Sequence, residues 1–112
     1  MLDLVAKKLF LTKGVGVADD KLTSFEFALR QAGIAGTNIV LISSIFPPNA
    51  KLVPRKDGLK LIKPGQILFT IYSRNQTNET NRLISASVGI AQPKDRSKYG
   101  YLSEYDAFGQ NE

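Results

Sequence analysis

The spacing of apolar residues predicts one clear helix, over residues 23–32. Its apolar side chains recur at helical spacing and define one buried face: Phe25, Ala28, Leu29 and Ala32. Thr23 is a favourable N-cap, and Glu26, three positions later, completes a capping box. Gly33 ends the helix in the way that glycine commonly does.

Short apolar or alternating runs predict five strands, over residues 8–12, 38–43, 67–73, 82–92 and 100–107. The run over 38–43 is apolar on both faces, which favours a central strand. The polar residues 74–81 resemble a hairpin connection, and Gly14 and Gly16 are expected to form a tight turn.

The order of these elements shows no regular alternation of strands and helices and no internal repeat. It predicts an α+β fold with a mostly antiparallel sheet, in one domain that covers residues 1–112. One helix cannot cover both faces of such a sheet. A second sheet, a partner subunit or missing chain must do so, and small domains often complete their core by forming oligomers.

Two adjacent serines, Ser43 and Ser44, follow a β-branched run and precede Pro47 and Pro48. The residue before a proline is held in extended conformations, so the chain turns at a restrained corner. A strained peptide bond beside a nucleophile could sit there. A strand cap or serine turn is the alternative, and the local pattern alone favours it.

The chain contains no cysteine and no histidine. This excludes disulfides, thiolate metal sites, cysteine nucleophiles and Ser-His-Asp triads, together with most zinc catalysis. Acid–base chemistry at neutral pH must therefore use Glu, Asp, Lys or Tyr with a shifted pKa, or a built-in or bound cofactor.

The formal net charge is +5, which makes nucleic acid or an anionic surface a candidate partner. Basic residues cluster between Pro48 and Pro64: Lys51, Arg55, Lys56, Lys60 and Lys63. They alternate with aliphatic residues, whereas a base-stacking surface needs exposed aromatic rings. A solvated edge or loop is therefore the favoured interpretation, and no nucleic-acid partner is expected.

No apolar run is long enough to span a membrane. Residues 1–8 carry their acid early and their lysines late, the reverse of a signal peptide. The sequence therefore predicts a cytoplasmic protein without a membrane partner.

Four stretches together resemble the pyruvoyl-dependent arginine decarboxylases, and the likeness extends over residues 8–112. They are Phe10–Gly16, Ser24–Ile34, Asn38–Pro48 with its Ser-Ser-Ile-Phe-Pro-Pro core, and Ser103–Tyr105. The Asn-x-x-x-x-Ser-Ser-Ile-x-Pro-Pro segment is the specific part.

The resemblance implies a self-processing enzyme. The Ser44 hydroxyl would attack the Ser43 carbonyl, and elimination and hydrolysis would leave chains 1–43 and 44–112, the second beginning with a pyruvoyl group. That ketone would form a Schiff base with the substrate amine and accept electrons as L-arginine loses carbon dioxide to give agmatine. Neither a metal ion nor pyridoxal phosphate is then expected.

The resemblance also implies roles for three further residues. Glu104 would be the proton donor, with an exposed strand glutamate as the alternative. Asn38 would hydrogen-bond near the cleavage site, or else serve as a turn residue at strand entry. Glu26 stands where the family commonly has Asp and would bind the substrate guanidinium, although the expected capping box competes for its carboxylate.

For the architecture, the resemblance implies an αββα-type sandwich in a homo-oligomer, a trimer or a hexamer, with sites between subunits. It also implies that a C-terminal helical part is missing after Glu112. The alternative is a non-catalytic protein: an unprocessed subunit or a small basic module that binds nucleic acid.

Overall fold

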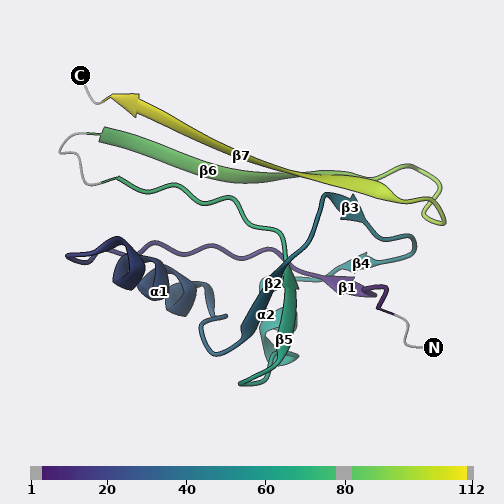
Figure 1. Ribbon diagram of the computed structural model, residues 1–112. Helices are drawn as coiled ribbons and strands as arrows, with labels where there is room; N and C mark the ends of the chain where they lie inside the picture. The colour runs from purple at the N-terminus through teal and green to yellow at the C-terminus, as the bar shows by residue number, and fades with distance from the viewer. Residues whose placement is uncertain (1–3, 78–81, 111–112) are drawn as a thin grey trace. The chain divides into compact units, whose positions relative to one another are not determined.

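A computed structural model describes residues 4–77 and 82–110 of the chain. This part contains two helices, α1 (Lys21–Ala32) and α2 (Arg55–Lys60) (Figure 1). The strands are β1 (Lys8–Leu9), β2 (Asn38–Leu41), β3 (Ile45–Phe46), β4 (Lys51–Leu52), β5 (Ile67–Thr70), β6 (Arg82–Ala91) and β7 (Gly100–Gln110).

The strands of the described residues form three small sheets. β1 pairs in parallel with β4, and β2 pairs with β5. The third sheet has the order β3-β7-β6 and is antiparallel. The α+β class is therefore confirmed, while the layered αββα arrangement stays a prediction.

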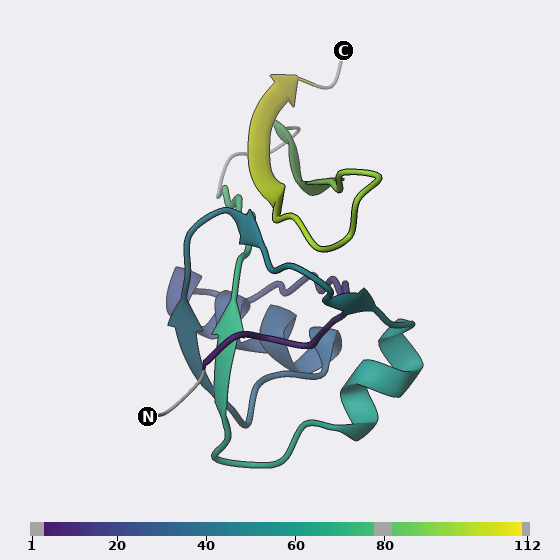
Figure 2. The same cartoon turned by 90° about the vertical axis from the view of Figure 1, so that its right-hand side faces the viewer.

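Two compact units divide the chain, and each is made of two separate segments. The first unit joins residues 1–40 to residues 50–69, and the second joins residues 41–49 to residues 70–112. Both helices and the parallel β1–β4 pair belong to the first unit (Figure 2).

Helix α1 begins earlier than its apolar periodicity predicts, because Asp20 is the N-cap. The Asp20 carboxylate accepts hydrogen bonds from the Thr23 backbone N–H at 2.7 Å and from the Thr23 hydroxyl at 2.8 Å. The expected cap at Thr23 and its capping box with Glu26 are therefore wrong. Gly33 ends the helix in the left-handed conformation (φ 87°), as predicted.

The expected tight turn at Gly14 and Gly16 is also wrong. The segment from Thr12 runs extended beside α1, and the Thr12 hydroxyl donates to the Ala32 carbonyl at 2.7 Å. A Cβ on Gly14 would overlap the Ala28 carbonyl oxygen, and one on Gly16 would overlap the Ser24 carbonyl oxygen. These glycines therefore allow backbone to lie directly against the helix.

Helix α2 was not predicted, because its six residues lack an apolar period. Its buried residue is Gly58, where a Cβ would overlap the ring of Phe10. Arg55 joins α2 to two earlier parts of the chain. Its Nε donates to Thr12 Oγ1 at 2.8 Å, and its Nη2 donates to the carbonyl of Gln31, in α1, at 3.0 Å. Arg55 thus has a structural role within the basic cluster.

In the second unit, β6 and β7 form a long antiparallel hairpin (Figure 1). Both strands were predicted, and the second extends past its expected end to Gln110. β3 pairs with the start of β7 through Ile45 opposite Tyr101 and Phe46 opposite Gly100. The side chains of Phe46 and Leu102 are buried in this unit.

Four predicted strands are shorter in the structure: 8–12, 38–43 and 67–73, and 82–92 by one residue. β2 is not the expected central strand, because within the described chain it pairs with β5 alone, and Val40 and Leu41 are exposed. In the predicted 74–81 connection, residues 74–77 form no regular element, and residues 78–81 lie outside the described part.

The buried apolar core of the described residues is small and consists of Ala32, Ile34, Phe46, Ala50 and Leu102. None of the helices in this part of the chain is long and apolar enough to cross a lipid bilayer.

The close approach at Gly16 can be tested with an added methyl group. Gly16→Ala should lower the free energy of unfolding by about 2–3 kcal/mol, because the new Cβ overlaps helix backbone that cannot rotate away. Gly36→Ala is the matched control, since the nearest atom to its Cβ would be 4.0 Å away, and it should change stability by less than about 0.5 kcal/mol. Urea denaturation measures both, and equal losses would contradict the close packing.

The Asp20 cap should make helix stability depend on pH. Hydrogen bonds from Thr23 hold the pKa of Asp20 below its ordinary value of 3.8. Its contribution is therefore fully present above pH 3.8 and is lost as the pH falls through the lowered pKa of the folded state. Asp20→Ala should lower the melting temperature by a few degrees at pH 7 and by less at pH 3. Circular dichroism measures the melting temperature at each pH. An equal decrease at both pH values would exclude an ionised cap.

Candidate functional site

The Ser43–Ser44 peptide lies in the short connection between β2 and β3. Ser43 has no regular structure, Ser44 lies at a bend, and β3 begins at the next residue. Both serines are exposed. After β3, Asn49 adopts a positive φ of 60°, and its backbone N–H donates to the Arg96 carbonyl at 2.7 Å. The restrained corner therefore has pairing strands on both sides.

Two backbone hydrogen bonds bracket the Ser43–Ser44 peptide. On one side, the Ile42 N–H donates to the Thr70 carbonyl at 3.0 Å. On the other side, the Ser44 carbonyl accepts from the Leu102 N–H at 2.7 Å. Ile42, Ser43 and Ser44 lie between β2 and β3 and belong to neither strand, and these two bonds hold the first and the last of them. The Ser44 hydroxyl and the Ser43 carbonyl thus belong to adjacent, exposed residues.

Glu104 lies on β7, the strand that holds the Ser44 carbonyl. It follows Leu102 by two residues, which is about 7 Å along a strand. Its partner on β6 is Val88. The structure therefore brings Glu104 to the same short stretch of β7 that anchors Ser44, with the Glu104 side chain exposed.

Asn38 is the first residue of β2, and its side chain has a local partner. Its Nδ2 donates to the Gly65 carbonyl at 2.9 Å, and its backbone N–H donates to the Gln66 carbonyl at 2.8 Å. These bonds hold the turn that precedes β5 and agree with the strand-entry alternative. The role beside the cleavage site stays a prediction.

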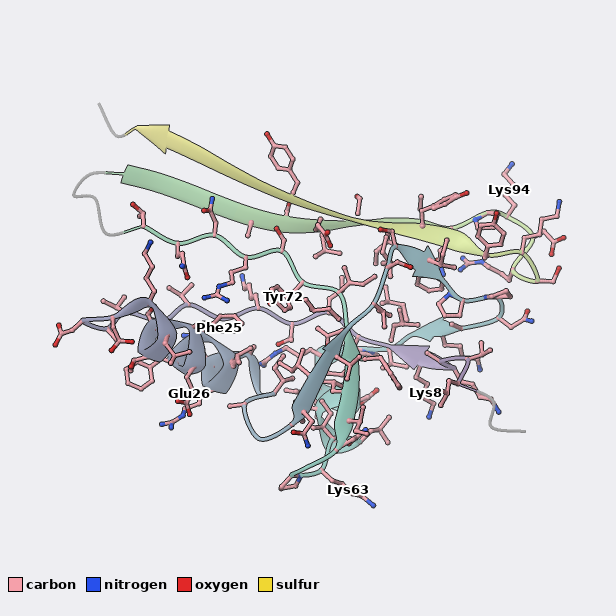
Figure 3. The ribbon with its side chains drawn as sticks, viewed as in Figure 1. Lys8, Phe25, Glu26, Lys63, Tyr72 and Lys94 are labelled. Atoms are coloured by element: carbon pink, nitrogen blue, oxygen red, sulfur yellow. The ribbon has the colours of Figure 1, made fainter. Side chains whose placement is uncertain are left out.

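Glu26 projects from α1 and is exposed over 56% of its side chain (Figure 3). Instead of closing a capping box, its Oε1 accepts from Arg30 Nη2 at 2.9 Å, one helical turn later. This geometry shows that the carboxylate can receive a guanidinium. Its proposed role toward a substrate stays a prediction.

Tyr101 is the residue of β7 opposite Ile45, and it contacts a second tyrosine. The rings of Tyr99 and Tyr101 meet edge to face, with centroids 5.7 Å apart. The hydrogen bond with the Tyr99 hydroxyl raises the pKa of Tyr101 above its ordinary value of 10.0. Tyr101 is therefore protonated at neutral pH.

Apolar side chains around the serines are unusually exposed: Leu41 at 60%, Ile42 at 43% and Ile45 at 42%. The basic cluster is exposed as well, at Lys51, Arg55, Lys56, Lys60 and Lys63. The choice of a solvated edge over a phosphate-binding surface stays a prediction. The sequence did not reveal Thr70 and Leu102 as anchors of the serine peptide, because they act through backbone groups that any residue carries.

Comparisons with known proteins show which family this chain resembles. Residues 8–112 match the family model described as "Pyruvoyl-dependent arginine decarboxylase (PvlArgDC)". The whole chain is 78% identical to the pyruvoyl-dependent arginine decarboxylase of Nitrosopumilus maritimus (strain SCM1) and covers 61% of its length. It is 55% identical to the protein of the same name from Thermoplasma volcanium and covers 62% of it.

A third relative with this name, from Picrophilus torridus, is 54% identical over 112 residues. The chain thus spans about three-fifths of the length of these curated relatives, at 61% and 62% for the first two. A family match over residues 8–112, together with identities of 54–78%, identifies the family. The chain belongs to the pyruvoyl-dependent arginine decarboxylases.

Proposed function

We propose that the protein cleaves itself between Ser43 and Ser44 and then decarboxylates L-arginine to agmatine and carbon dioxide. The observation that carries the proposal is the bracketing of this peptide by two backbone hydrogen bonds, Ile42 N–H to Thr70 and Leu102 N–H to Ser44. They hold Ile42 and Ser44, while the peptide between Ser43 and Ser44 lies outside the strands.

Cleavage begins when Ser44 Oγ attacks the Ser43 carbonyl carbon. The peptide C–N bond breaks, an ester forms, and the Ser44 nitrogen becomes a free amine. Loss of the Ser44 α-proton and of the Cβ–O bond releases the Ser43 carboxylate and leaves dehydroalanine at position 44. Tautomerisation and hydrolysis by water then release ammonia and leave a pyruvoyl group.

The residues present fit that group, because the Ser44 carbonyl becomes its amide carbonyl and is already held by Leu102. Once formed, the ketone supplies an electrophile for the substrate amine, as a Schiff base, and an electron sink during loss of carbon dioxide. Leu102 N–H fixes the direction of the residue-44 carbonyl. Glu104, farther along the same strand, delivers a proton to the substrate carbon.

Glu26 is the proposed contact for the substrate guanidinium. Its pairing with Arg30 supports this role, because the same carboxylate already accepts a guanidinium N–H at 2.9 Å. A charged hydrogen bond of this type favours arginine over amino acids with uncharged side chains.

The complete site is proposed to form between subunits of a trimer or hexamer. The exposed Leu41, Ile42 and Ile45 support this assembly, since a neighbouring subunit would remove their apolar surface from water. The same burial would also exclude water from the surroundings of Glu104.

Self-cleavage predicts two chains under denaturing conditions. Mass spectrometry should find residues 1–43 and residues 44–112, and the second chain should be blocked at its N-terminus. Ser44→Ala should give one intact chain, because the attacking oxygen is gone. Ser43→Ala is the matched control and should still cleave, since Ser43 contributes its carbonyl and not its hydroxyl. An intact wild-type chain after long incubation would support the alternative of an unprocessed, non-catalytic subunit.

The two pieces should stay together in native gel filtration. Residues 1–40 and 50–69 belong to one compact unit, and the chain is cut outside both segments. Separation of the pieces without denaturant would contradict this reading of the structure.

The role of Glu26 predicts a selective change in substrate binding. Glu26→Gln should raise KM for arginine about tenfold by removing a charged hydrogen bond, and self-cleavage should be unchanged. Arg30→Gln, which removes the internal partner, should not raise KM. Carbon dioxide release from arginine, lysine, ornithine and aspartate would measure specificity, and a preference for an acid without a guanidinium would remove the assigned role.

A further inference from the structure

The strand that carries Glu104 receives limited support from other strands. β3 pairs with β7 only at Gly100 and Tyr101, and beyond Leu102 the described ladder joins β7 to β6 alone. An isolated two-stranded ribbon is marginally stable and bends easily. The position of Glu104 relative to Ser44 therefore depends on contacts from outside the β6–β7 hairpin.

One such contact comes from Ser73, in the segment that connects β5 to β6. Its hydroxyl donates to the Tyr105 carbonyl at 2.6 Å, across a sequence separation of 32 residues. The residue is half-buried. The other contact is the bond from the Leu102 N–H to the Ser44 carbonyl at 2.7 Å. These two hydrogen bonds lie on either side of Glu104 along β7.

We propose that Ser73 is a positioning residue that holds Glu104 at the distance from Ser44 needed for proton delivery. The inference rests on the proposed function, because it assigns a purpose to the placement of Glu104. Ser73 does not touch the reacting atoms. It acts through the Tyr105 carbonyl, which fixes the backbone immediately after Glu104.

The bond also suits this purpose chemically. The Tyr105 residue pairs with Ser87 on β6, so its carbonyl already belongs to the hairpin ladder. A carbonyl oxygen has a second lone pair, and the Ser73 hydroxyl can use it without breaking strand pairing. Ser73 thus restrains the hairpin from outside while the hairpin itself stays intact.

Hydrogen–deuterium exchange tests the restraint independently of catalysis. Ser73→Ala should speed exchange in peptides that cover residues 102–106, and Ser73→Thr should restore the wild-type rate because it keeps the hydroxyl. Ser97→Ala is the control, since the Ser97 hydroxyl also makes a 2.6 Å bond, to Asp95, in the loop before β7. Unchanged exchange in Ser73→Ala would overturn the proposal whatever the protein catalyses.

Kinetics of the processed enzyme test the consequence. Ser73→Ala should still yield chains 1–43 and 44–112, while kcat for arginine falls about tenfold with little change in KM, because a proton donor is displaced. Ser73→Thr should recover most of kcat. Equal losses of cleavage, kcat and thermal stability in Ser73→Ala would instead show a merely structural residue and overturn the proposal.

A misplaced donor also predicts a distinct product. When the proton reaches the Ser44-derived carbon instead of the substrate carbon, the amino group stays on the protein, and hydrolysis by water releases the decarboxylated substrate as an aldehyde. Chain 44–112 then begins with alanine, which mass spectrometry detects. The alanyl chain should accumulate faster per turnover in Ser73→Ala than in wild type, and equal accumulation would overturn the positioning role.

The two proposals can fail separately. A wild-type protein that does not cleave would refute the proposed function, whereas hydrogen–deuterium exchange would still test whether Ser73 restrains the hairpin.

Discussion

The bonding between the first forty residues and residues 50–69 is the constraint on which the rest of the structure depends. β1 pairs with β4, Asn38 holds the turn before β5, and Arg55 reaches both Thr12 and the Gln31 carbonyl. Each of these contacts joins sequence before residue 41 to sequence after residue 49. The compact unit that they form therefore does not need covalent continuity through the serine corner.

The peptide that is proposed to be cleaved can therefore lie outside the strands while its neighbours keep a fixed geometry. Ile42 and Ser44 are held by backbone hydrogen bonds, to Thr70 and to Leu102 respectively. Backbone bonds persist through side-chain substitution, so the anchors do not depend on residue type at those positions. The proposed chemistry is instead assigned to a few side chains, and one of them, Glu104, lies on the strand that also anchors Ser44.

Periodicity predicted the elements with strong patterns, namely α1 and the strands β6 and β7. It did not predict their pairing, and it failed where local packing determines the structure. α2 was not predicted because its buried position holds Gly58 and no apolar side chain, and this leaves room for the ring of Phe10. Gly14 and Gly16 resembled a turn because sequence does not distinguish a bend from a close backbone approach.

For the candidate site, the serine–proline motif pointed to Ser43 and Ser44. Thr70, Leu102 and Ser73 could not be predicted, because their hydrogen bonds involve backbone groups and no sequence motif marks them. The pairing of Glu26 with Arg30 follows from their spacing of one helical turn, which the expected capping box obscured.

The Glu26–Arg30 ion pair has a consequence for the proposed binding of arginine. Both side chains are more than half exposed, at 56% and 62%, and such a pair contributes about 0.3–0.5 kcal/mol on a helix surface. At that strength the Glu26 carboxylate is paired with Arg30 for about two-thirds of the time. The apparent affinity of Glu26 for an external guanidinium then falls about threefold. Substrate capture is then an exchange of one guanidinium for another, with nearly the same charge around Glu26 before and after. The helix thus carries a weak internal mimic of the ligand that its glutamate is proposed to select.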